Sequence, residues 1–236
     1  MAGLHAGVLD ALGRRIVDGV LAPGTVLTLA QIESEFGVSR TVARETMRLL
    51  ESMGLVSSRR RVGITVNAPA HWNVLDQRLI RWRLQGHRRE EQLRNLTELR
   101  LAVEPLSAAL AAERADDDDR QRLVDLASRL QELGAEGLGR SEDYLQSDIA
   151  FHTLLLSASG NEMIAALGDV IVEVLVGRTK LGMMPERPVP ASQHGHLALA
   201  RAVASGDADA AEREAVALLS EVRSGLGRAA LGRFGD

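Results

Sequence analysis

An acidic residue and a histidine, Asp148 and His152, stand four positions apart in the second half of the chain. Positions i and i+4 of an α-helix lie on the same face, so a carboxylate and an imidazole would project together. Apolar residues flank them on that side: Tyr144, Phe151 and Leu155. Burying either polar group inside a helical bundle is costly unless it has a partner. The pair therefore predicts either a bound divalent metal ion or a mutual hydrogen bond.

A second chemical feature lies near the N-terminus, where Ser39 is suited to cap a helix. One predicted face of this helix is apolar and consists of Val42, Thr46, Leu49, Leu50 and Met53. The opposite face carries Arg40, Thr41, Arg44 and Arg48. Arginine neutralises phosphates or pairs with guanine, and a helix N-terminus itself favours phosphate. The pattern predicts a helix that reads the DNA major groove, with an ordinary amphipathic helix as the alternative.

The segments around this helix indicate a winged helix-turn-helix. Residues 28–36 predict a preceding helix that is capped by Thr28 and ends at a turn on Gly37. Residues 54–66 predict a two-stranded hairpin, the wing, and its basic tip contains Arg59, Arg60, Arg61 and Gly63. Helix, turn, basic helix and basic hairpin are independent local signals that agree on one fold.

The remainder of the chain predicts helices throughout. A linker helix is expected over residues 69–90, which hold Trp72 and Trp82. Later helices are expected at 92–114, 119–133, 141–157, 161–181, 191–205 and 207–227. The expected fold is mainly α, with a winged helix-turn-helix domain and small β wing over 1–68 and an all-helical bundle over 91–230.

Composition limits the class of protein. Residues 1–68 hold eight basic and six acidic side chains, a net charge of +2, whereas the remainder holds 20 basic and 26 acidic, a net charge of −6. This asymmetry indicates a basic DNA-binding domain joined to an acidic second domain. The chain has no Cys, which excludes a disulfide scaffold and a cysteine zinc site. No signal peptide or membrane span is evident, so we expect a cytoplasmic protein with no membrane partner.

The segment 36–55, FGVSRTVARETMRLLESMGL, and the wing ending in GITV at 63–66 are similar to the GntR family of bacterial transcription regulators. The resemblance implies that Ser39, Arg40, Thr41 and Arg44 contact operator DNA and that Gly63 is the wing glycine. Ala30 departs from the pattern, because many relatives carry a basic residue there. One DNA contact of those relatives is therefore not expected here.

The second domain resembles the FCD ligand-binding domain of the FadR subgroup in ELRLAVEP (98–105), SDIAFHTLLLSASGN (147–161) and HLALARAVASGD (196–207). In metal-binding members an Asp and three His hold a divalent ion such as zinc. Three of these positions are Asp148, His152 and His196, whereas the fourth is Leu218, which cannot coordinate. The resemblance leaves two readings open: a three-ligand metal site, or a metal-free site in which the histidines bind the effector directly.

The same resemblance implies that Arg100 pairs with an acidic effector, with Arg178 as a weaker candidate. The linker WNVLDQRLIRW (72–82) and the missing fourth His resemble the branch that regulates catabolism of sugar acids such as galactonate. The expected protein is a homodimeric repressor that an aldonate-type acid releases from double-stranded operator DNA, without an organic cofactor. The alternatives are a metal-dependent enzyme using Asp148, His152 and His196, and a same-fold regulator of hydrophobic acyl ligands.

Overall fold

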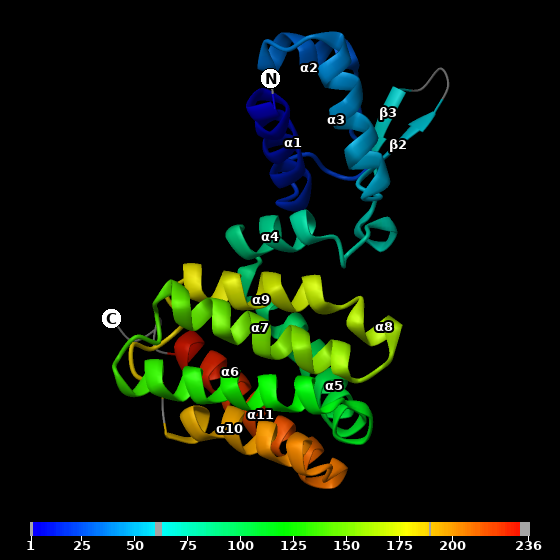
Figure 1. Ribbon diagram of the computed structural model, residues 1–236. Helices are drawn as coiled ribbons and strands as arrows, with labels where there is room; N and C mark the ends of the chain where they lie inside the picture. The colour runs from blue at the N-terminus through cyan, green and yellow to red at the C-terminus, as the bar shows by residue number, and fades with distance from the viewer. Residues whose placement is uncertain (1, 60–62, 189, 232–236) are drawn as a thin grey trace. The chain divides into compact units, whose positions relative to one another are not determined.

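The computed structural model describes residues 2–59, 63–188 and 190–231. The chain forms two compact units, Met1–Gln92 and Leu93–Asp236, and each is described by itself. The first unit holds a small sheet beside its helices, and the secondary structure described for the second unit is all helical (Figure 1). The predicted mainly-α class, with an N-terminal winged helix-turn-helix and a C-terminal helical domain, is confirmed. None of the described helices is long and apolar enough to cross a bilayer.

The first unit begins with α1 (Ala2–Val17), α2 (Leu29–Phe36) and α3 (Arg40–Ser52). Its wing consists of β2 (Val56–Arg59) and β3 (Gly63–Val66), which pair in antiparallel fashion with Val56 opposite Val66. A third strand that the sequence did not predict, β1 (Val26–Leu27), pairs with the other side of β3. The wing is therefore attached to the segment that leads into α2, in the sheet order β1-β3-β2.

Local capping explains where the two helices of the motif begin. Thr28 accepts a hydrogen bond from the Gln31 backbone, and the Gln31 side chain accepts one in return from the Thr28 backbone. This capping box satisfies two donors that a helix N-terminus would otherwise leave unpaired. Gly37 then takes the left-handed conformation at φ 63°, and Ser39 caps α3 by accepting from Val42 N. All three predicted roles are confirmed.

Residues 69–85 form a 3-10 helix, Pro69–His71, followed by α4 (Gln77–Gln85), which Asp76 caps. Both Trp72 and Trp82 are buried in one apolar core with residues of α1 and α3. The Trp82 indole donates to Asp10 Oδ1 at 3.0 Å, and a Cβ on Gly13 would lie 2.3 Å from its ring. Because Gly13 has no side chain, α1 leaves room for the ring of Trp82 of α4 to pack against its backbone.

The second unit is built from long helices. They are α5 (Arg89–Arg114, which begins in the first unit), α6 (Asp117–Ala135), α7 (Glu142–Ala158), α8 (Glu162–Ala165), α9 (Gly168–Lys180), α10 (Pro190–Ser205) and α11 (Ala208–Leu231). The single helix predicted at 161–181 is wrong, because the chain breaks it into α8 and α9. A tight turn, in which Leu167 N donates to Ile164 O at 3.0 Å, separates the two, and Gly168 opens α9.

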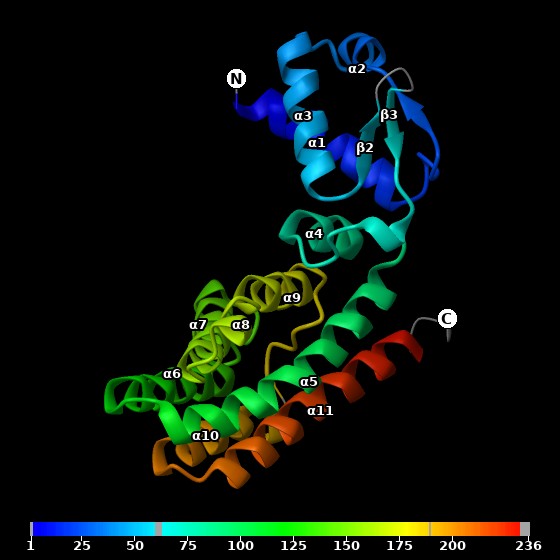
Figure 2. The same cartoon turned by 90° about the vertical axis from the view of Figure 1, so that its right-hand side faces the viewer.

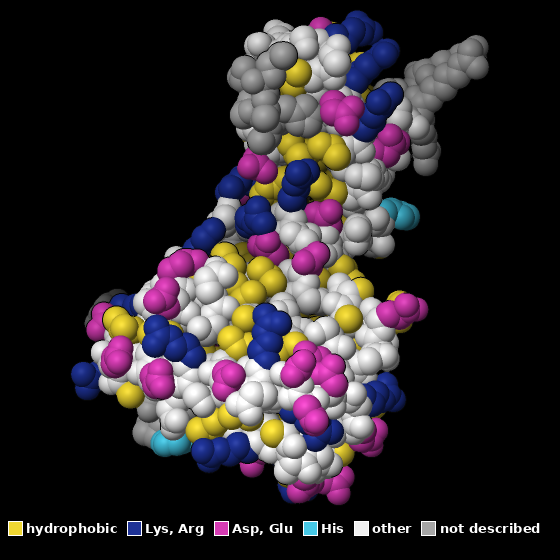
Figure 3. Space-filling view, viewed as in Figure 1, with side chains coloured by type: hydrophobic (Ala, Val, Ile, Leu, Met, Phe, Trp, Pro, Cys, Tyr) yellow, Lys and Arg dark blue, Asp and Glu magenta, His cyan; other side chains and the backbone are white. Residues whose placement is uncertain are grey.

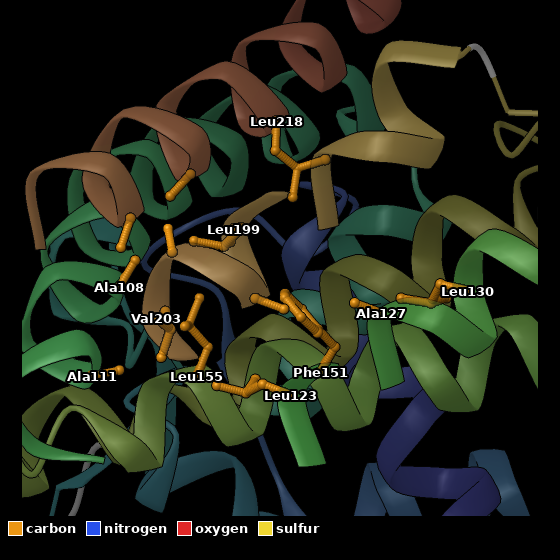
Figure 4. Packing of buried hydrophobic residues seen from close by; sticks show 14 of the residues in the cluster. Ala108, Ala111, Leu123, Ala127, Leu130, Phe151, Leu155, Leu199, Val203 and Leu218 are labelled. Carbon is orange, nitrogen blue, oxygen red and sulfur yellow. The ribbon is translucent and has the colours of Figure 1, made fainter. Parts of the chain in front are cut away.

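An aliphatic core holds these helices together. α6 packs against α7 and α10, α10 packs against α11, and α7 packs against α9 (Figure 2). Side chains of five helices meet in one cluster that includes Ala108, Leu123, Phe151, Val203 and Leu218 (Figure 4). With few aromatic rings in the chain, the small Ala residues let helices approach closely while Leu and Val fill the remaining space. This apolar packing surrounds the polar site described below.

Arg120 ties the ends of two helices together. Its guanidinium donates to Ala112 O and Ala115 O at the end of α5, and to Val203 O and Ala204 O at the end of α10. The last carbonyls of a helix lack partners within the helix, and the negative end of its dipole favours a cation. One arginine therefore supplies hydrogen-bond donors to carbonyls near the C-terminal ends of both α5 and α10.

Candidate functional site

The first candidate surface is the outer face of α3. Ser39, Arg40, Thr41, Arg44 and Arg48 are all exposed. The inner face is buried and consists of Ala43, Thr46, Met47 and Leu50. The space-filling view shows Lys and Arg side chains gathered along the side of the unit where α3 lies (Figure 3). The helix thus presents cations outward while its apolar face holds it on the protein, which suits insertion into a DNA groove.

A groove of about 320 Å³ lies between α3 and the wing. Arg44 and Arg48 line it on the helix side, and Ser58 and Ile64 line it on the wing side. Glu51, near the end of α3, accepts a hydrogen bond from Ser58 N at 2.9 Å. Helix α3 and strand β2 are thereby joined by a hydrogen bond on the side that carries the exposed arginines.

The basic tip of the wing falls largely outside the described residues. Arg60 and Arg61 lie outside them, and of Arg59 only the backbone is described, as the end of β2. Gly63 has φ 107°, and a Cβ there would lie 3.1 Å from Val26 Cγ1. Backbone conformation therefore explains why glycine stands at position 63, because other residues rarely adopt this φ and Val26 of β1 leaves little room for a side chain.

The second candidate site is a group of polar side chains inside the second unit. Arg100 and Glu104 stand on α5, Asp148 and His152 on α7, and His196 on α10, and each is at most 5% exposed. Oδ1 of Asp148 lies 3.3 Å from His152 Nε2 and 3.2 Å from His196 Nε2. The sequence-predicted residues Arg100, Asp148, His152 and His196 are thus brought together from three helices.

Glu104 is the member of this group that the sequence did not reveal. Its Oε1 accepts from Arg100 Nε at 2.5 Å, and its Oε2 lies 2.8 Å from His152 Nδ1. Arg100 Nη2 in turn lies 3.1 Å from His152 Nε2. The spacing held a signal, because Glu104 follows Arg100 by four positions and must share its helix face.

Charge pairing keeps the buried carboxylates ionised. Burial alone raises the pKa of Asp148, but its contacts with His152 and His196 outweigh burial and hold the pKa well below its ordinary range. Burial likewise opposes ionisation of Glu104, yet Arg100 and His152 lower its pKa to about 2. For His152, burial lowers the pKa, and Glu104 reverses that effect so that the pKa ends above its ordinary value.

Two inaccessible nitrogens near this group have no hydrogen-bond partner among the described residues, Arg100 Nη1 and Arg178 Nε. Arg178 stands on α9 and is half-buried. Burial and the nearby charge of Arg100 lower the pKa of Arg178 to about 10, against the opposing effect of Asp148. An unpaired buried donor is costly, so these two N–H groups favour an acceptor supplied from outside, such as an anion.

The donor set of Asp148, His152 and His196 fits a divalent metal ion. One ligand atom from each lies within 4.8 Å of the others, and two imidazoles with a carboxylate are ligands that zinc accepts. Leu218, for which the family resemblance implies a fourth His in metal-binding members, is buried in the apolar cluster, and a Cβ on Gly195 would lie 3.0 Å from its Cδ1. The position that the family resemblance gives to a fourth His therefore holds an apolar side chain in the hydrophobic cluster.

We expect acid to destabilise the second unit through Glu104. Because its folded pKa of about 2 lies below the ordinary 4.5, its stabilising effect is complete above pH 4.5 and is lost as pH falls toward 2. Urea unfolding followed by circular dichroism across this range should therefore show the stability gap between wild type and Glu104→Gln narrowing toward low pH. Glu98→Gln, an exposed change on the same helix, serves as control, and parallel curves for wild type and Glu104→Gln would contradict the prediction.

Residues 4–66 match the family of bacterial regulatory proteins called gntR, and residues 95–221 match the FCD domain. Over 217 residues, 90% of this chain and 92% of the relative, the chain is 31% identical to the galactonate operon transcriptional repressor of Escherichia coli (strain K12). It is 30% identical over 218 residues to the HTH-type transcriptional regulator LutR of Bacillus subtilis (strain 168), covering 89% and 95% of the two chains.

A solved structure of Lar, which controls expression of the Listeria monocytogenes agr system, has the same fold. Its TM-score is 0.62 at 18% identity, over 95% of this chain and 96% of that one.

Proposed function

This chain belongs to the GntR family with an FCD domain and is a ligand-responsive, DNA-binding transcription regulator, and we propose that it represses an operon for sugar-acid catabolism. The observation that carries the effector class is the buried charged group around Arg100, Asp148 and His152 inside an otherwise aliphatic bundle. A relative at 31% identity is a galactonate operon repressor, and this supports an aldonate as the effector.

The effector's acid group would lie against Arg100 and Arg178, whose Nη1 and Nε have no partner among the described residues. Its hydroxyls would hydrogen-bond the carboxylate and imidazoles of Asp148, His152 and His196. A regulator of hydrophobic acyl chains is disfavoured, because an acyl tail offers no hydrogen-bonding groups to the polar side chains that line this site.

Asp148, His152 and His196 would also hold a divalent ion such as zinc. When bound, such an ion supplies a Lewis acid that anchors the effector's carboxylate and hydroxyl oxygens at coordination positions the protein leaves open. In the metal-free form the same three side chains would contact the effector by hydrogen bonds. An enzymatic use of this site is set aside, because the family and the relatives are transcription regulators.

Operator binding would use a homodimer in the cytoplasm, since two half-sites give the affinity that one small reading head lacks. Arg40, Thr41 and Arg44 would contact bases or phosphates, assisted by Ser39 and Arg48. The wing, with Arg59, Arg60, Arg61 and Gly63, would contact the adjacent backbone. The effector releases the DNA only if it binds the DNA-free state more tightly than the DNA-bound state.

A thermal-shift screen tests this proposal. The full chain is heated with galactonate, other aldonates, lactate and medium-chain fatty acids, each with added Zn²⁺ and with a chelator. A true effector at a hundredfold excess over its Kd stabilises the folded state by about 2.7 kcal/mol, which raises the melting temperature. Stabilisation by fatty acids but not by hydroxy acids would overturn the effector class. Loss of the galactonate shift with chelator would favour the metal-loaded site over the metal-free one.

A further inference from the structure

Glu104 lies between Arg100 and His152 in the buried site. Its carboxylate is 1% exposed and uses both oxygens, one for Arg100 and one for His152. These partners serve different purposes in the proposed function, since Arg100 would bind the effector's acid group and His152 would bind a metal ion or the effector's hydroxyls. Glu104 is thus in direct contact with both Arg100 and His152.

The contact with His152 fixes how the imidazole is used. Oε2 of Glu104 lies 2.8 Å from Nδ1, so the proton of a neutral imidazole belongs on Nδ1. Nε2 then carries the lone pair and points to the side where Asp148 Oδ1 lies 3.3 Å away and His196 meets the same oxygen. A carboxylate behind a coordinating histidine is the usual arrangement that fixes the tautomer and ring orientation of a metal ligand.

The contact with Arg100 fixes which edge of the guanidinium is available. Glu104 takes Nε at 2.5 Å and approaches Nη2 at 3.4 Å, so this edge is already paired. Nη1 is buried and has no hydrogen-bond partner in the described part of the chain. An incoming carboxylate therefore meets one N–H edge of Arg100, near Arg178, and does not replace Glu104.

We propose that Glu104 is a positioning residue that holds the Nδ1–H tautomer of His152 and the orientation of Arg100 with one carboxylate, and so couples the metal or hydroxyl side of the site to its acid-binding side. This inference rests on the proposed function for the identity of the effector. The tautomer of His152 does not depend on that identity. If Glu104 only stabilised the fold by pairing with Arg100, its replacement would lower the melting temperature. It would not change the tautomer of His152 or the affinity for a metal ion or an effector.

The first test compares wild type, Glu104→Gln and the control Glu98→Gln, all as the full chain without metal at alkaline pH. Long-range ¹H–¹⁵N NMR reports which ring nitrogen carries the proton, and the His152 signals are those lost in His152→Asn. Wild type and control should show the proton on Nδ1. Glu104→Gln should show a mixture with the Nε2–H form, because an amide can either accept from or donate to Nδ1. The same Nδ1–H tautomer in all three proteins would overturn the proposal.

The second test uses Co²⁺, whose absorption spectrum reports bound ion, in competition with a chromophoric chelator. Glu104→Gln should weaken Co²⁺ binding by about 10–100-fold, whereas Glu98→Gln should leave it unchanged. Equal affinities in wild type and Glu104→Gln would also overturn the proposal. If the wild type takes up no Co²⁺, the tautomer measurement alone decides the role of Glu104.

A third measurement separates this inference from the proposed function. Calorimetric titration with galactonate should show binding weakened by about tenfold in Glu104→Gln, since a charge-assisted contact that orients Arg100 is lost. No galactonate binding by wild type contradicts the proposed effector, while the tautomer result still stands. If Glu104→Gln changes the tautomer of His152 but leaves galactonate affinity unchanged, the proposed coupling between His152 and Arg100 is wrong.

Discussion

Replacing Arg100 with methionine is expected to abolish the response to an acidic effector and to lower the free energy of unfolding of the second unit by about 3–5 kcal/mol. The loss of stability follows because Glu104, 1% exposed and paired with Arg100 Nε, would keep a buried charge with half of its compensation removed. The loss of response follows because the acid-binding N–H group of Arg100 is gone. Urea unfolding and calorimetric titration with galactonate measure the two effects separately.

A double variant separates folding from binding in this experiment. Arg100→Met combined with Glu104→Gln removes both charges, so most of the stability should return while galactonate still fails to bind. Arg94→Met, an exposed substitution on the same helix, is the matched control and should change neither measurement. Galactonate binding that survives in the refolded double variant would show that Arg100 does not receive the acid group.

Arg44→Ala is expected to weaken operator binding by about 1–3 kcal/mol for each reading head, and by twice that for a dimer on two half-sites. Arg44 is exposed on α3 and lines the groove beside the wing, while Ala43 and Met47 bury the other face of the same helix. Its removal should therefore leave the fold intact and delete a base or phosphate contact. Fluorescence anisotropy with an operator selected from random DNA, at fixed salt, measures the change.

The salt dependence of this binding identifies the kind of contact that Arg44 makes. If Arg44 contacts phosphate, the slope of log affinity against log salt should fall by about one for each arginine removed, whereas a base contact should change sequence preference instead. Arg122→Ala, which removes an exposed arginine from the second unit, should change neither. Identical affinity, slope and preference in Arg44→Ala and wild type would refute the assignment of α3 as the recognition helix.

Local chemistry made much of the fold predictable. The starts of α2 and α3 are predictable from their N-caps, Thr28 and Ser39, and the end of α2 is predictable from Gly37. Capping residues and a left-handed glycine act on their immediate neighbours, so the local sequence contains this information. Strand β1 was missed because two residues, Val26 and Leu27, hold no periodicity, and only pairing with distant β3 makes them a strand. The break between α8 and α9 was missed because a single short turn, rather than a Gly–Pro signal, makes it.

The candidate site was predictable only in part. Asp148 and His152 were recognisable from their i, i+4 spacing, whereas His196 stands 44 positions later and was found through resemblance to a family. Glu104 escaped notice because an Arg and a Glu four positions apart usually form an exposed pair on a helix surface. Only the packing of α5 among the other helices, which a local pattern does not encode, buries this pair against His152.

The indole of Trp82 seated over Gly13 has a consequence for protein engineering. A chimaeric regulator that grafts this DNA-reading unit onto a foreign sensor should retain α4 with the graft. A junction at residue 68 would strip two tryptophans and Leu79 from the interior of the donor fragment and leave Asp10 without its indole donor. A splice point beyond α4 keeps that interior whole, so the cloning boundary belongs after residue 85 and not at the end of the wing.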